Sequence, residues 1–151
     1  MTSRRVVYVA AGIAIALGAL ALGIFVHDAS GESSAATKII YVDGERFNVV
    51  VADTLASRAR GLGGTESMIA DGMLFIFDAD GKHAIWMKDM NFSIDIVWIT
   101  ADGLIVHTAQ SISQDTFPQV FTPDSPARYV LEVPAGFVES HDIRVGSRVT
   151  F

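Results

Sequence analysis

The chain has 151 residues, which is enough for one compact domain and a short accessory segment. Hydrophobic residues make up 50% of it, and the mean hydropathy of +0.39 is high for a soluble protein. The formal net charge is −6 and no basic stripe is visible, which argues against a nucleic-acid partner. There is no cysteine, which excludes disulfides, a thiol nucleophile and a thiolate metal site.

The excess of apolar residues lies in an uninterrupted run from Val6 to Val26. A helix of that length is about 31 Å long, which matches a bilayer core of about 30 Å. We therefore expect residues 6–26 to form a transmembrane anchor that follows a stub of residues 1–5. A cleaved signal peptide is the alternative, since Ser34-Ala35-Ala36 offers small residues for cleavage, although its apolar region is usually shorter.

Charges beside the run predict its direction. Arg4 and Arg5 precede it, and no Lys or Arg follows before Lys38, so the N-terminus is expected in the cytoplasm and the C-terminal part outside it. Ala10, Ala14 and Gly18 recur at every fourth position, a spacing that allows two such helices to pair weakly. Residues 27–36 are small and polar, as in a flexible linker.

Residues 37–151 carry the signals of a β-rich domain. Asp43-Gly44 separates two apolar alternating segments and favours a tight hairpin turn. One short helix is expected near residues 54–62, with Asp53 or Thr54 as its N-cap. Further strands are expected at residues 73–78, 83–88, 93–100, 104–109, 127–133 and 148–151, with a long proline-containing loop over 110–126. This pattern predicts an antiparallel sandwich or a barrel-like domain.

A series of short motifs runs through this domain in a fixed order. It consists of Arg58-x-x-Gly61-Leu62, Asp71-Gly72-Met73-Leu74-Phe75-x-Phe77, Trp86-Met87-Lys88, Ile94-Asp95-Ile96, Asp102-Gly103-x-Ile105-Val106, Tyr129-Val130-Leu131-Glu132-Val133-x-Ala135-Gly136, and Gly146. The series resembles the domain-of-unknown-function 192 family over residues 38–151. The resemblance implies a compact, mainly-β sandwich with one short helix, and no established reaction. The chain departs from the family at Gly63-Gly64-Thr65, where the family tends to have a methionine and an arginine.

Asp95 is the most conspicuous candidate site residue. Alternation along its strand places it beside Val97 and Ile99, with Ile94, Ile96 and Trp98 on the other face. Both faces are otherwise apolar, so the carboxylate is expected to point inward or into a pocket. It then needs a partner, for example Lys88, Arg58 or backbone N–H groups.

Glu132 is the second candidate carboxylate. It alternates with Val130 and Arg128 and either faces solvent or meets Asp95 in a cleft. In the second case, the two acids would suit a hydrolase of the kind that cleaves glycosides.

A third hypothesis concerns the sulfur atoms of Met87 and Met90. With His83 nearby in the sequence, they would suit Cu(I) in an exported protein that has no thiols. The structural alternative is that these methionines fill gaps in the core.

The preferred interpretation is a non-enzymatic, membrane-tethered binding or accessory module of the cell envelope. Its ligand pocket is expected to include Trp86, Lys88 and Asp95, with Arg58 and Glu132 at a polar rim. Its partner would be a small ligand or an envelope protein, and no cofactor is expected.

Overall fold

The computed structural model describes residues 36–151. The expected anchor over residues 6–26, the N-terminal stub and all but the last residue of the linker lie outside this range. Within it, no helix is long and apolar enough to cross a bilayer.

The described residues form nine strands, two short α-helices and one 3-10 helix, η1. In chain order these are β1 (Thr37–Val42), β2 (Glu45–Ala52), α1 (Leu55–Arg60), β3 (Gly72–Gly81), β4 (Ile85–Trp86), β5 (Ile94–Ile99), β6 (Ile105–Ile112), η1 (Gln114–Thr116), β7 (Val120–Phe121), β8 (Ala127–Pro134), α2 (Phe137–Ser140) and β9 (Val149–Thr150). The mainly-β class is therefore confirmed.

Seven strands form one sheet in the order β6-β5-β8-β3-β2-β1-β9, and β4 pairs with β7 in a separate ribbon. All neighbouring strands are antiparallel except β2 and β3, which run parallel with Val49 opposite Gly72. Of the two predicted forms, a sandwich or a barrel-like domain, the barrel-like one is closer to the structure, and the expectation that all strands are antiparallel was wrong for β2 and β3. The segment between β2 and β3 contains α1 and returns the chain to the end where β2 began, as a parallel connection requires.

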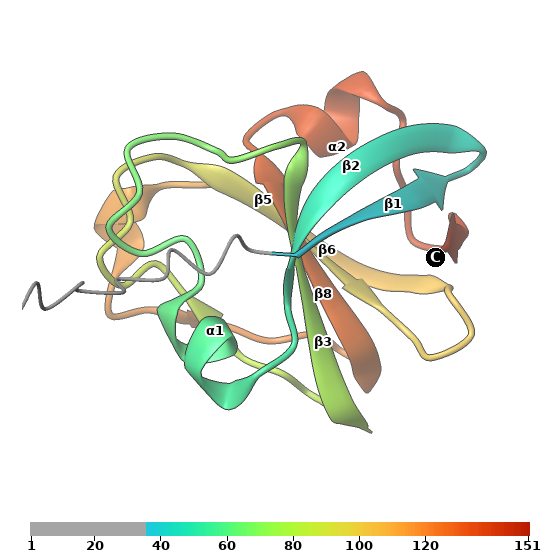
Figure 1. Cartoon of the computed structure of the whole chain (residues 1–151), viewed down its shortest axis with the longest axis horizontal. Coiled ribbons are helices and arrows are strands. Elements are labelled where there is room, and N and C mark those ends of the chain that lie inside the picture. Colours follow the sequence, from blue (N-terminus) through green and yellow to red (C-terminus); the bar gives the residue numbers. More distant parts are fainter. Residues whose placement is uncertain (1–35) are drawn as a thin grey trace, which may run out of the picture. The chain divides into compact units, whose positions relative to one another are not determined.

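The sheet is rolled into a half-barrel, in which the edge strand β9 comes close to the opposite edge at β6. β9 pairs with β1, and beside it Arg148 bridges to Leu104 next to β6. The backbone N–H of Val149 donates to the carbonyl of Gly103 at 2.7 Å. In Figure 1 the β1–β2 hairpin correspondingly curls toward the C-terminus.

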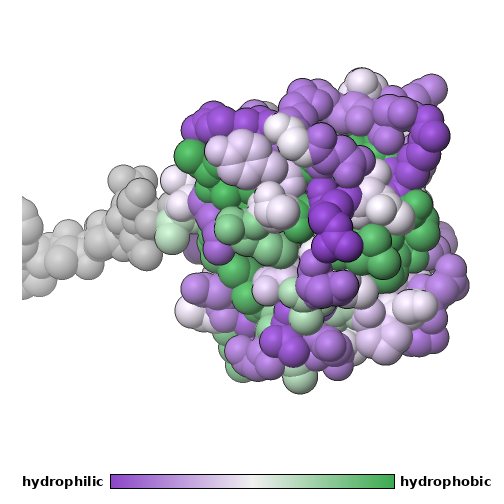
Figure 2. Space-filling model, turned by 90° about the vertical axis from the view of Figure 1, so that its right-hand side faces the viewer, coloured by the Kyte–Doolittle hydropathy of each residue, from purple (hydrophilic) through white to green (hydrophobic). Residues whose placement is uncertain are grey.

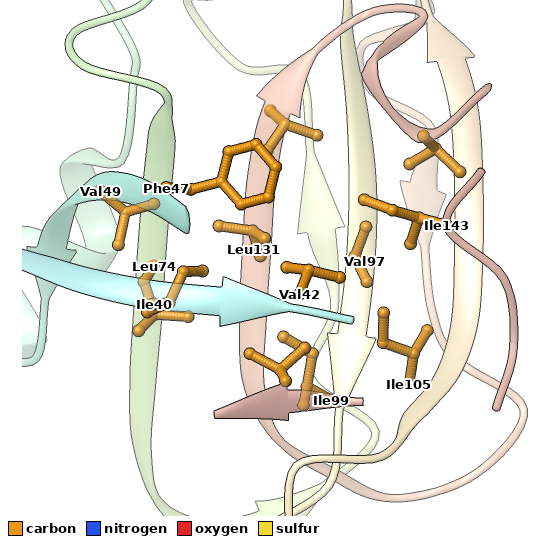
Figure 3. Close-up of a cluster of buried hydrophobic side chains, with 13 residues drawn as sticks. Ile40, Val42, Phe47, Val49, Leu74, Val97, Ile99, Ile105, Leu131 and Ile143 are labelled. Carbon is orange, nitrogen blue, oxygen red and sulfur yellow. The ribbon is translucent and has the colours of Figure 1, made fainter. Parts of the chain in front are cut away.

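Two hydrophobic clusters cover the two faces of the rolled sheet. The inner cluster contains Leu131, Val97 and side chains from β1, β2, β3 and β6 (Figure 3). Val138 of α2 also belongs to it. The outer cluster contains Trp98, Ile96 and Val130, and it is covered by Leu62 after α1 and by residues of the β4–β7 ribbon. The two helices therefore belong to opposite faces of the sheet, and they lie apart in Figure 1.

Local sequence signals explain most of the turns. Asp43 and Gly44 both have positive φ, 48° and 88°, as the tight β1–β2 hairpin turn requires. Thr54 and Ser57 form a capping box that starts α1, and Gly61 ends this helix, so the expected helix is confirmed. The one-turn helix α2 was not expected; it begins after Gly136, which has a φ of 84°.

Polar residues divide the surface of the domain on the side shown in Figure 2. There, apolar residues gather in separate patches on either side of a hydrophilic band. That face therefore offers no continuous apolar surface.

Candidate functional site

A cavity of about 360 Å³ opens over the outer cluster. Its walls come from α1 and the glycine loop after it, from β3, from the segment that starts at β4, and from Glu132 on β8. The lining residues are Leu55, Arg58, Ala59, Arg60, Gly61, Leu62, Gly63, Phe75, Phe77, Ala84, Ile85, Trp86, Lys88, Asp89, Met90 and Glu132. Nine of these side chains are apolar or aromatic and five are charged, so the cavity combines apolar walls with several charged groups.

The glycine run after α1 forms part of the cavity wall. A Cβ atom on Gly63 would lie 3.1–3.2 Å from the carbonyl oxygens of Arg60 and Lys88. The N–H of Gly64 donates to the carbonyl of Asp89 at 2.8 Å, which fastens this loop to the opposite wall. Gly63 therefore allows the backbone on the two sides of this loop to approach closely.

Glu132 is the only buried carboxyl group that lines the cavity, among the residues the structure describes. Its residue is 5% exposed, and its Oε2 atom has no hydrogen-bond partner within residues 36–151. On the neighbouring strands it is paired with Met73 and Ile96, which are both apolar. Burial raises the pKa of Glu132 to about 8, so the group is mostly a neutral carboxylic acid at pH 7.

Asp95 does not line the cavity. It shares the inner face of the sheet with Val97 and Ile99, where its two oxygens accept backbone N–H groups from Ser111 at 2.7 Å and Val138 at 2.9 Å. The predicted side of the strand was right, and backbone groups are the partner it needed. Its predicted place in the pocket was wrong, because the carboxylate anchors α2 to the sheet instead.

The hypothesis of an Asp95–Glu132 acid pair is overturned by the same geometry. Asp95 pairs with Val133 across β5 and β8, whereas Glu132 pairs with Ile96. Adjacent positions on a strand face opposite sides of the sheet. The two carboxyl groups therefore lie on opposite faces and share no cleft.

The remaining predicted pocket residues, Arg58, Trp86 and Lys88, line the cavity together with Glu132. The Arg58 side chain is largely buried, where it donates to the carbonyls of Asp53 and Ile76 and lies 3.6 Å from the carboxylate of Asp78. It therefore fastens α1 to β3. That Arg58, Trp86 and Lys88 bind a ligand stays a prediction.

Trp86 and Lys88 are both exposed at the cavity. Trp86 is 53% exposed, and its ring meets the ring of Phe117 edge-on at 5.7 Å. The Lys88 ammonium lies 3.9 Å from the carboxylate of Asp89. Both side chains are therefore accessible to a ligand.

The predicted Cu(I) ligands are not gathered in the cavity. Met87 is buried in the outer cluster, and the ring of His83 stacks on Phe77 with 3.6 Å between centroids. Of the three residues, only Met90 lines the cavity. Met87 thus fills the core, which is the structural alternative, and this arrangement gives the copper hypothesis no support. Among the described residues, no group of three or more histidines and acidic residues is placed to hold a metal ion.

Sequence reasoning missed Phe75, Phe77 and Arg60 as cavity residues. The two phenylalanines occupy alternate positions of β3 and so share one face, a signal that was visible in the sequence. Arg60 lies in the last turn of α1, where a cation is favoured by the helix dipole whether or not a cavity is present. The helix α1 lies over the same face of the sheet as Glu132 because it is part of the crossover between β2 and β3. The sequence pattern did not reveal this crossover.

Comparison with known proteins identifies the family. A family model described as DUF192, an uncharacterized ACR, matches residues 38–151. The chain belongs to the DUF192 family. A UPF0127 protein from Thermococcus gammatolerans is 26% identical to this DUF192 chain over 106 residues, which are 69% of this chain and 66% of the relative. The chain thus matches just under two thirds of the length of that relative.

Two solved structures share the fold of this DUF192 domain. One is a protein from Sinorhizobium meliloti proposed to be a transcription regulator, with a TM-score of 0.74 and 28% identity over 80% of this chain and 97% of that one. The other is a protein of unknown function from Novosphingobium aromaticivorans, with a TM-score of 0.69 and 21% identity over 80% of this chain and 89% of that one. The second likeness concerns the fold alone.

Proposed function

We propose that this DUF192 protein is a membrane-tethered, extracytoplasmic binding module that takes a small ligand into the cavity beside α1. The observation that carries this proposal is the buried Glu132 carboxyl group, whose Oε2 atom has no partner among the described residues. An unpaired buried polar group is costly to a folded protein, and a ligand in the cavity that bonds to the Glu132 carboxyl group reduces that cost.

The composition of the cavity favours binding over catalysis. Phe75, Phe77 and Trp86 give it aromatic walls, and Glu132 is separated from the other buried acid, Asp95, by the sheet. The predicted catalytic pair is not available in the cavity, because Asp95 lies on the other face of the sheet, and the exposed Asp89 carboxylate lies 3.9 Å from the Lys88 ammonium. The same site is therefore proposed to capture and release its ligand unchanged.

The proposed location is supported by the sequence before residue 36. Residues 6–26 are long enough and apolar enough for a membrane anchor, and Arg4 and Arg5 favour a cytoplasmic N-terminus. Alkaline phosphatase fused after Phe151 is expected to be active and to stay in the membrane fraction. Activity in the soluble extracytoplasmic fraction would replace the anchor with a cleaved signal. An inactive phosphatase, with an active cytoplasmic reporter at the same position, would overturn the proposed location.

The cavity itself is tested by a pair of substitutions on α1. Ala59 lines the cavity and Ala56 does not, although both are exposed on the same helix. Ala59→Trp therefore fills the cavity, and Ala56→Trp is a control with the same change in helix propensity.

The measurement is a thermal-shift screen of small amphipathic compounds on the full chain in a mild detergent. Compounds that raise the melting temperature of the wild type are expected to do so for Ala56→Trp and to lose their effect on Ala59→Trp. Equal effects on both variants, or no stabilising compound at all, would contradict the proposed function.

A further inference from the structure

The charges around the cavity contrast with the acidic chain as a whole. Arg58, Arg60 and Lys88 line it, against Asp89 and the neutral Glu132, whereas the chain carries a net charge of −6. Arg58 is held by Asp78, and Lys88 lies near Asp89. Arg60 is exposed and forms no ion pair with another described residue. The entrance therefore presents cationic groups that an anion can meet.

The buried Glu132 requires a different kind of ligand group from the anion that suits the exposed cations. Its neighbours on β3 and β5, Met73 and Ile96, are apolar and cannot bond to its buried oxygen. Because the group is mostly protonated at pH 7, it has an O–H to donate. The partner that it lacks is a hydrogen-bond acceptor, such as the oxygen of a ketone or an amide.

We infer that the ligand is a small amphipathic anion whose apolar body carries a neutral hydrogen-bond acceptor, with the acceptor bonded to Glu132, the body against Phe75 and Trp86, and the anionic group at Arg60 and Lys88. This inference rests on the proposed function of the cavity and specifies the chemistry of its ligand. Each part of this ligand matches one kind of lining residue: the buried acid, the aromatic walls and the exposed cations.

A ligand with an ammonium group fits these observations less well. It would have to pass the cationic residues of the entrance, and it would require Glu132 to ionise in an apolar setting. The two kinds of ligand respond oppositely to pH, because one needs the protonated acid and the other needs the carboxylate.

Four matched probes separate the alternatives on the full chain in detergent at pH 7. Para-acetylbenzoate has both the anion and the acceptor. Para-isopropylbenzoate keeps the shape without the acceptor, para-methylacetophenone lacks the anion, and para-(aminomethyl)benzoate has an ammonium group. Dissociation constants are measured by NMR titration.

Para-acetylbenzoate is expected to bind about tenfold more tightly than para-isopropylbenzoate, because only the first satisfies the buried O–H. It is also expected to bind more tightly than para-methylacetophenone, and Lys88→Gln should reduce that difference. Equal affinity for the acetyl and isopropyl compounds, or tightest binding of the ammonium compound, would overturn the inference.

Glu132→Gln supplies the second readout, since glutamine keeps a donor but cannot ionise. For the wild type, the affinity for para-acetylbenzoate is expected to fall by about tenfold between pH 7 and pH 9, as a carboxyl group with a pKa of about 8 ionises. The other charged groups at the cavity are Arg58, Arg60, Lys88 and Asp89, and His83 stacks on Phe77 outside the lining.

In Glu132→Gln the binding should persist and its pH dependence should disappear. Loss of binding in this variant, or an affinity of the wild type that rises toward pH 9, would overturn the inference.

The failure of the inference is distinguishable from that of the proposed function. Suppose that no probe binds, but that screened compounds still raise the melting temperature of Ala56→Trp and not that of Ala59→Trp. In that case the cavity binds a ligand of another class. If the probes bind equally to both tryptophan variants, the proposed function fails as well.

Discussion

Asp95 and Glu132 lie on the neighbouring strands β5 and β8, yet their carboxyl groups occupy opposite faces of the sheet. Asp95 faces the inner cluster, where two backbone N–H groups satisfy it, whereas the Oε2 atom of Glu132 has no partner among the described residues. A one-residue difference in register thus separates a structural carboxylate from a candidate ligand-binding acid.

Asp95→Asn is expected to destabilise the domain. The Asp95 carboxylate accepts hydrogen bonds from two backbone N–H groups, and asparagine would turn its own NH₂ group toward one of them. The free energy of unfolding should therefore fall by about 2–4 kcal/mol. Urea denaturation of the full chain in detergent, followed by tryptophan fluorescence, measures the change. Asp53→Asn, at an exposed position, is the control and should have almost no effect. Equal stability of the two variants would show that Asp95 is not an anchor for α2.

Glu132 should make stability depend on pH in the direction opposite to that of an ion-paired carboxylate. Its pKa rises from 4.5 in the unfolded chain to about 8 in the folded one, so between these values the folded state holds a proton that the unfolded state has lost. The stabilisation from this proton is fully present below pH 4.5 and is lost as pH rises to about 8, by about 1.4 kcal/mol per pH unit. Denaturation of the wild type and Glu132→Gln at a series of pH values tests this. The stability of the wild type relative to the variant should fall steadily over that window, and a constant difference would contradict the account.

The two tryptophans should differ sharply in their contribution to stability. Trp98 is fully buried and its Nε1–H donates to the carbonyl of His83 at 2.8 Å. Trp98→Phe leaves that carbonyl without its donor and opens a small cavity, so a loss of about 1–3 kcal/mol is expected in urea denaturation. Trp86→Phe, at a half-exposed position, is the matched control with a loss below about 0.5 kcal/mol. A larger effect at Trp86 than at Trp98 would be inconsistent with the burial described above.

The predictions made from sequence alone succeeded where a local pattern determined the structure. The Asp43-Gly44 hairpin, the capped helix α1 and the buried strand β5 each follow from a few adjacent residues. Alternation also gave the correct faces of Asp95 and Glu132 relative to their strand neighbours.

The failures came from long-range arrangement. The parallel pairing of β2 and β3 depends on the path of the intervening segment, and no pattern in either strand specifies it. The register between β5 and β8, which places the two acids on opposite faces, has the same origin. The cavity combines residues from α1, β3, β4 and β8, so it becomes visible only after those elements are assembled.

The closure of the half-barrel is tested by two glycines with similar φ angles. A Cβ atom on Gly103 would lie 2.1 Å from the carbonyl oxygen of Val149, whereas one on Gly44 would meet nothing within 4 Å. Both have positive φ, +83° and +88°, so alanine at either position costs about 1 kcal/mol in backbone strain. Gly103→Ala should cost at least about 2 kcal/mol more, because it also displaces β9. Equal melting temperatures of the two variants would argue against the contact between Gly103 and Val149.

The ionisation of the Glu132 carboxyl group tests the central claim most directly. It can be followed by NMR of the full chain labelled with carbon-13 at the glutamate carboxyl groups, and the signal can be assigned from its loss in Glu132→Gln. We expect a pKa of about 8 without ligand and a higher value with para-acetylbenzoate, which favours the protonated acid. The increase should be absent in Ala59→Trp. A pKa near the ordinary value of 4.5, or one that no cavity ligand changes, would contradict the account.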